Sequence, residues 1–149
     1  MEVIMNLDKK ILDLLLKKAE KAYKKGEIPV SAVILDQSGK IISSSFNNRQ
    51  NKYNVLGHAE INAIDIACKK IDSWILEGAT LYVTLEPCIM CAGALGWSQI
   101  PRIVYGAGDD KRGFRRFAPQ ALHPRCEVVS GVLEEECATL MKSFFQKKR

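Results

Sequence analysis

The sequence predicts an α/β fold, a sandwich of helices around one five-stranded sheet. Short, dense apolar runs that suit strands alternate with longer segments whose apolar residues recur every three or four positions. The 149 residues are enough for one domain with its own core, and no repeat, linker or low-complexity tract divides them. Residues 1–149 are therefore expected to form a single domain.

The first expected element is an amphipathic helix over residues 8–25. Its apolar face is formed by residues spaced three or four apart: Ile11, Leu15, Ala19, Ala22 and Tyr23. Asp8 is the expected N-cap, and Gly26 is the expected stop.

Five strands and three further helices follow. Strands are expected at residues 28–35, 40–46, 79–85, 102–107 and 126–133. Turn residues at 36–39 should join the first two strands into a hairpin. Helices are expected at residues 58–71, 87–98 and 134–148. The apolar face of the first of these should hold Ile61, Ile64, Ala67, Cys68 and Ile71. Pro87 should stand in the first turn of the second, and the charges of the last match the helix dipole.

Composition and charge exclude some classes of protein. No apolar run is long enough to span a membrane, and no leader-like segment is present, so we expect a cytoplasmic protein. Five cysteines, two of them in a C-x-x-C pair, favour metal binding or redox chemistry over disulfides in such a compartment. The net charge of +5 hints at a polyanionic partner.

Two motifs carry ligand and acid/base residues: "GHAEINAI" at 57–64 and "TLEPCIMCAGAL" at 84–95. Zinc takes Cys sulfur and His nitrogen in a tetrahedral shell, and a catalytic zinc keeps one position for water. Cys88 and Cys91 are three residues apart and share one face of a helix. His58 stands at another predicted helix start. We therefore expect one Zn²⁺ per chain held by His58, Cys88 and Cys91.

Glu60 is the expected catalytic acid/base. Side chains two apart in a helix point about 200° away from each other, so Glu60 can join His58 only where the helix begins. Two thiolates cancel the charge of the ion, which leaves a need for a carboxylate to take a proton from the attacking water.

Plainer interpretations stay open for these residues. His58 could be a core or capping histidine, and Cys88 and Cys91 could be buried thiols or a redox pair. His123 or Cys126 could complete the shell and make the zinc structural. Glu86 could assist at the helix entrance or simply be solvated.

With these motifs the chain resembles the zinc-dependent cytidine and adenosine deaminases. The segments "EIPVSAVI", "LYVTLEPCIMCAGAL", "RIVYGAGDDKRG" and "GVLEEECATLMKSFF" resemble bacterial tRNA-specific adenosine deaminases along nearly the whole chain. The resemblance implies a three-layer cytidine-deaminase-like sandwich with a mixed sheet. It also implies attack of zinc-activated water on C6 of the wobble adenosine, which yields inosine and ammonia.

The resemblance also implies roles for single residues. His58, Cys88 and Cys91 would be the zinc ligands, and Glu60 would shuttle the proton. Asn47, Ala59 and Pro87 would bind the substrate: Asn47 would hydrogen-bond the base, and backbone groups at Ala59 and Cys88 would hold the water and the developing charge.

The implied partners are a tRNA anticodon stem-loop and a second copy of the chain. Basic and aromatic residues interleave in "KRGFRR" and Phe117, at 111–117, a pattern typical of single-stranded RNA contacts. The alternative is a solvated loop whose two aromatic residues pack inward. Two other functions remain in view, deamination of a free base such as guanine or cytosine, and a non-catalytic zinc-binding subunit of an RNA deaminase. Glu60 argues against the second, since a non-catalytic subunit needs no proton shuttle.

Overall fold

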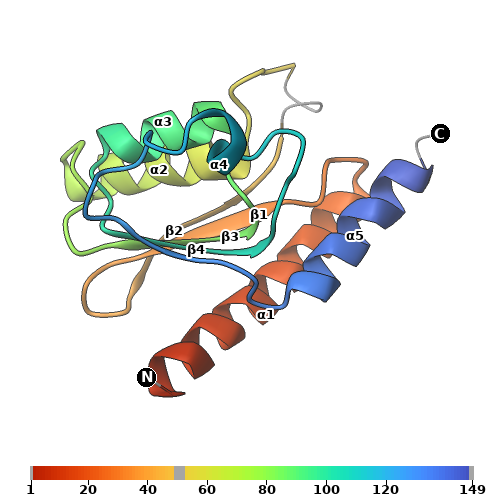
Figure 1. Cartoon of the computed structure of the whole chain (residues 1–149), viewed down its shortest axis with the longest axis horizontal. Helices are drawn as coiled ribbons and strands as arrows, with labels where there is room; N and C mark the ends of the chain where they lie inside the picture. The colour runs from red at the N-terminus through yellow and green to blue at the C-terminus, as the bar shows by residue number, and fades with distance from the viewer. Residues whose placement is uncertain (1, 49–52, 148–149) are drawn as a thin grey trace.

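The computed structural model, which describes residues 2–48 and 53–147, is a sheet covered by helices on both faces (Figure 1). The helices are α1 (Glu2–Lys24), α2 (Ala59–Ile71), α3 (Ile89–Trp97), α4 (Phe114–Phe117) and α5 (Glu134–Lys147). The strands are β1 (Ser31–Leu35), β2 (Ile41–Phe46), β3 (Thr80–Leu85), β4 (Arg102–Ala107) and β5 (Glu127–Val129). All five predicted strands and the four predicted helices are present, and α4 is an addition.

The sheet is mixed, as predicted. Its strand order is β2-β1-β3-β4-β5. β1 pairs antiparallel with both β2 and β3, which confirms the predicted hairpin. β3, β4 and β5 are parallel, so the connections after β3 and β4 leave the sheet from the same edge. This edge carries the segment that leads into α3.

Three layers are visible in Figure 1, where α2 and α3 cover one face of the sheet and α1 and α5 cover the other. Alternate residues of each strand pack against the two helix layers, because successive side chains of a strand point to opposite faces of the sheet. Ile34, Leu81 and Ile103 pack towards α2 and α3, whereas Val33 and Val104 pack towards α1. Both faces are therefore buried, which explains the dense apolar strands.

The helix α2 approaches the sheet through small side chains. Its buried row is Ala59, Ala63 and Ala67, and Ile71 is 41% exposed. The predicted apolar face is confirmed in part, because Ala67 is buried and Ile64 and Cys68 pack against the same core, whereas Ile71 is not buried. Small alanine side chains let the backbone of α2 lie close to the strands.

The helix α1 begins at Glu2, and Asp8 is not its N-cap. Asp8 lies within the helix and is buried, where its carboxylate accepts hydrogen bonds from the Tyr82 hydroxyl (2.8 Å) and from Arg102 Nη2 (2.7 Å). The partners come from β3 and β4, so no local pattern could reveal them. The helix does end near the predicted stop, where Gly26 adopts a φ of +82° that disfavours other residues.

The remaining differences lie at element boundaries. β5 is only three residues long, and the short α4 forms within a segment predicted to be aperiodic. Pro87 precedes Cys88, the N-cap of α3, and so lies outside the first turn where it was predicted. Within the described residues no helix is long and apolar enough to cross a membrane.

Candidate active site

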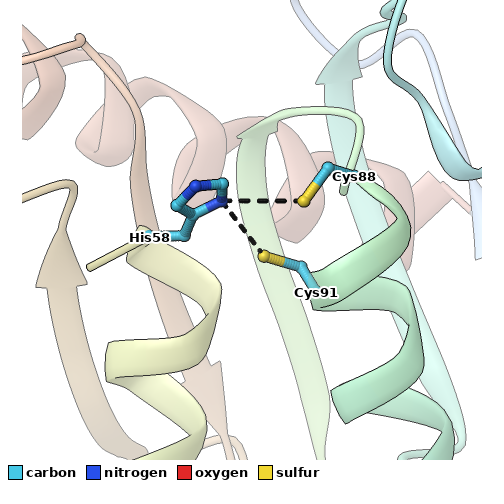
Figure 2. Close-up of side chains that lie close together, drawn as sticks. All are labelled: His58, Cys88 and Cys91. Atoms are coloured by element: carbon cyan, nitrogen blue, oxygen red, sulfur yellow. Dashed lines mark hydrogen bonds between the residues drawn. The ribbon is translucent and has the colours of Figure 1, made fainter. Parts of the chain in front are cut away.

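Two helices begin beside each other and bring the candidate ligands together. His58 is the N-cap of α2, and Cys88 is the N-cap of α3. Figure 2 shows the His58 ring directed towards both cysteine sulfurs, with Cys91 one turn into α3. Because both caps have extended backbone conformations, each side chain projects from a helix end rather than from its wall.

The distances fit a tetrahedral zinc shell. His58 Nδ1 lies 3.6 Å from Cys88 Sγ and 3.5 Å from Cys91 Sγ, and all three ligand atoms are within 4.8 Å of one another. Zinc bonds of about 2.3 Å to sulfur and about 2.0 Å to nitrogen, at a tetrahedral angle, place N and S about 3.5 Å apart. The side chains are thus spaced as ligands of one ion.

Among the described residues, no fourth protein ligand joins this group. Within residues 2–48 and 53–147, it is the one group of three or more His, Cys, Asp or Glu side chains that could hold a metal. His123 and Cys126 lie in the described part and outside the group, so the structural-zinc alternative finds no support. Three protein ligands leave the fourth position available, which is the arrangement of a catalytic zinc.

A hydrogen bond joins the side chains of Cys88 and Cys91. A hydrogen bond with Cys91 and interactions with His58 lower the pKa of Cys88 to about 4. Burial acts in the opposite direction and is outweighed. The same hydrogen bond, together with burial and the nearby Glu60 carboxyl, raises the pKa of Cys91 far above its usual range. The hydrogen bond between the two side chains thus moves the pKa of Cys88 down and the pKa of Cys91 up.

Glu60 lies beside these sulfurs. It is in the first turn of α2 and only 5% exposed, so the helix-tip condition set by the sequence is met. Burial is the largest cause that raises the pKa of Glu60 to about 7, and the Cys88 sulfur adds to it, while His58 and Cys91 lower it. A carboxyl with this pKa can both accept and donate a proton near neutral pH.

The three expected substrate-binding residues lie on separate segments. Asn47 follows β2 and is 4% exposed, and its backbone N–H donates to the Val30 carbonyl (3.0 Å). Ala59 is the first residue of α2 and is fully buried. Pro87 lies between Glu86 and the candidate ligand Cys88, and its carbonyl accepts the N–H of Phe114 (2.9 Å).

Glu86 has a structural role that sequence reasoning missed. Its side chain is 2% exposed, which excludes the solvated interpretation. Although burial raises the pKa of this carboxyl, hydrogen bonds from Arg115 and from the backbone N–H groups of Asp109 and Arg115 outweigh it and lower the pKa overall. The one sequence signal was a carboxylate directly after an apolar strand and before Pro87.

The basic and aromatic residues at 111–117 divide into two sets. Phe114 is buried, and the Arg115 guanidinium lies 5.6 Å above the Tyr105 ring while it pairs with Glu86. Arg116 instead lies 5.1 Å above the ring of Phe117, which is 54% exposed. Of the two aromatic residues expected to pack inward in the loop alternative, only Phe114 does so, and the RNA interpretation stays a prediction.

Comparison with known proteins identifies the family. A family model described as "Cytidine and deoxycytidylate deaminase zinc-binding region" matches residues 5–107. The chain belongs to this deaminase family. It is a hydrolytic deaminase whose cofactor is zinc. The match includes both helix starts that carry the candidate ligands.

Relatives and solved structures refine the likeness. The chain is 43% identical to the tRNA-specific adenosine deaminase of Bacillus subtilis over 150 residues, which cover 97% of this chain and 92% of the relative. It is also similar to a solved structure from a study of A-to-I editing by tRNA:A34 deaminases, with 39% sequence identity and a TM-score of 0.78. That match covers 86% of this chain and 96% of the other chain. The guanine deaminase of Bacillus subtilis is 34% identical with a TM-score of 0.61, over 65% of this chain and 62% of that one. The predicted cytidine-deaminase-like fold is confirmed.

Proposed function

We propose that this chain deaminates adenosine to inosine at the wobble position of a tRNA anticodon. One observation carries the proposal: the likeness to a tRNA-specific adenosine deaminase spans 97% of the chain. It therefore continues past residue 107, where the zinc-binding region ends, into the 108–117 segment and α5. A likeness confined to the zinc chemistry would not favour one base substrate over another.

The proposed zinc ligands are His58, Cys88 and Cys91, with one ion per chain. When bound, the ion supplies Lewis acidity that makes a water molecule a nucleophile near neutral pH. Two thiolate sulfurs and one imidazole nitrogen would hold it, which leaves the fourth ligand position to water.

Glu60 is the proposed acid/base. Its carboxyl takes a proton from the attacking water and delivers a proton to the leaving amino group of adenine, so that adenosine and water become inosine and ammonia. Its burial beside the candidate ligands supports this role, because Glu60 interacts with His58, Cys88 and Cys91.

The proposed substrate contacts are Asn47, Ala59 and Pro87. Asn47 would hydrogen-bond the base, while Ala59 and Pro87 would shape the pocket through their backbone at the two helix starts. The roles of Ala59 and Pro87 are supported by their places in the chain, since Ala59 follows His58 directly and Pro87 precedes Cys88 directly.

The proposed partners are an anticodon stem-loop and a second copy of the chain, in the cytoplasm. For the homodimer the support is an apolar hollow lined in part by Trp74 and Trp97, which are 64% and 77% exposed. Tryptophan is enriched in protein interfaces, so a patch of this kind suits a second protein surface. Sedimentation of the purified protein should give the mass of a dimer, and a monomer at micromolar concentration would reject this part.

The substrate is tested with a stem-loop RNA that carries adenosine at the wobble position. Incubation with purified, zinc-loaded protein followed by sequencing should show inosine at that position and at no other adenosine. Free guanine and cytosine, offered in parallel, should release little ammonia. Ready deamination of a free base with an untouched stem-loop at low and high salt would leave the zinc chemistry standing and reject the tRNA substrate.

A further inference from the structure

A buried carboxylate near the zinc ligands is joined to the 108–117 segment. Glu86 is 3% exposed and stands between β3 and Cys88. Its oxygens accept hydrogen bonds from the N–H of Asp109 (2.9 Å), the N–H of Arg115 (3.1 Å) and Arg115 Nη2 (3.1 Å). All three donors belong to the 108–117 segment, so Glu86 ties that segment to the strand end that leads into Cys88.

Backbone contacts keep the same segment close to the site. Gly113 forms an isolated β-bridge with Cys88, and the N–H of Phe114 donates to the Pro87 carbonyl (2.9 Å). A Cβ atom at Gly113 would collide with the Glu86 carboxyl and with the Asp109 carbonyl oxygen. The turn can therefore pass over Glu86 only because position 113 has no side chain.

This anchoring decides which side chains of the segment face solvent. Glu86 fixes the Arg115 guanidinium by an ion pair although the Arg115 side chain stays half exposed, and Phe114 is buried. Arg116 and Phe117, the next two residues, then lie outside as a cation–π pair. An arginine over an exposed aromatic ring offers both a charge for phosphate and a face for a base.

We propose that Glu86 is a positioning residue for RNA binding, which holds the 108–117 segment so that Arg116 and Phe117 are presented to the substrate beside the active site. This inference rests on the proposed tRNA substrate. Glu86 itself does not contact RNA in this scheme. It acts through Arg115 and the two backbone N–H groups, which require a buried, negatively charged acceptor.

The test is Glu86→Gln, which keeps the shape of the side chain and removes its charge. The KM for the anticodon stem-loop should rise about tenfold or more, because charge-assisted hydrogen bonds are about twice as strong as neutral ones. The kcat should stay within about twofold and zinc should stay stoichiometric, since binding to RNA is lost rather than chemistry. Amide hydrogen exchange at Asp109 and Arg115 should become faster.

Gly113→Ala tests the same contact from its other side. It keeps the charge of Glu86 but forces the turn and the Glu86 carboxyl apart, so it should raise the KM in the same way. The matched control is Glu77→Gln, the same charge change on an exposed residue before β3. It lies about 20 Å away, because β3 has six residues at about 3.3 Å each. The KM of this control should equal that of the wild type.

The outcomes separate the inference from the function on which it rests. If the wild-type protein leaves the stem-loop unmodified, the proposed function fails and the RNA role of Glu86 fails with it. If the wild type is active and Glu86→Gln has an unchanged KM, the inference alone is wrong. Loss of zinc from Glu86→Gln would assign the residue to the metal site instead. A normal KM in Gly113→Ala beside a raised one in Glu86→Gln would show that Glu86 does not act through the turn.

Discussion

Two clusters of buried polar side chains lie on opposite faces of the sheet and differ in how their charges balance. Beneath α1, the Arg102 guanidinium meets the carboxylate of Asp8, which also accepts the Tyr82 hydroxyl. At the starts of α2 and α3, an imidazole, two sulfurs and the Glu60 carboxyl converge instead. The first cluster pairs a cation with an anion. The second brings together electron-pair donors that would bind a divalent cation. The first cluster therefore contributes to stability, and the second is suited to bind a metal.

The largest effect should come from breaking the second cluster. Cys91→Ala removes a fully buried ligand, so the protein should lose zinc and deaminase activity should fall to the background of the assay. Metal analysis and ammonia release measure the two losses. Cys126→Ala, a cysteine outside the group, should keep both. Stoichiometric zinc in Cys91→Ala would remove this residue from the ligand set.

Glu60→Gln separates the metal from the chemistry within the same cluster. The amide keeps the shape and cannot shuttle protons, so zinc should remain while kcat falls by about 10²–10⁴. Asp65→Asn on the exposed side of the same helix is the control, and it loses only a surface pair with Lys69. Near-normal turnover in Glu60→Gln would mean that another group moves the proton.

Local spacing explains why the second cluster was predictable. His58 and Glu60 are two residues apart, and Cys88 and Cys91 are three apart, so the period of a helix limits how each pair can point. The chemistry of zinc predicted that the two helix starts would lie together. In the structure the candidate ligand atoms at these helix starts are close enough to bind one ion. The order of elements was predicted for the same reason, since strands and helices have different apolar periods.

The first cluster could not be predicted, because its members are far apart in sequence. Asp8 looks like a helix cap until Arg102, 94 residues later, is placed beside it by the sheet. The same holds for Phe114 and Phe117, which stand in one basic segment and have opposite burial. Phe114 joins the core cluster that also holds Leu95 and Tyr105, whereas Phe117 lies outside that cluster, and no local pattern distinguishes the two.

Arg102→Ala should break the first cluster and leave the second intact. Removing one partner of a buried pair typically costs about 3–5 kcal/mol, because the Asp8 carboxylate stays buried without its cation. Urea unfolding of the zinc-loaded protein measures the free energy, and kcat should stay near the wild-type value. Lys17→Ala breaks the exposed pair with Asp13 and should cost no more than about 0.5 kcal/mol. Equal costs for the two variants would show that burial adds nothing to the Asp8–Arg102 pair.

The smallest effect should come from a charge that belongs to neither cluster and faces outward. Arg116→Ala removes the guanidinium above Phe117, so the affinity for the anticodon stem-loop should fall a few-fold. Because each phosphate contact releases counterions, the slope of log affinity against log salt should also decrease by about 0.7–0.9. Fluorescence anisotropy of a labelled stem-loop at several salt concentrations measures both quantities. Lys40→Ala removes the same charge from the β1–β2 hairpin, at the opposite end of the sheet from Cys88, and should change neither. If the two variants reduce the slope equally, RNA binding depends on net charge alone. In that case Arg116 and Phe117 make no specific contact with the stem-loop.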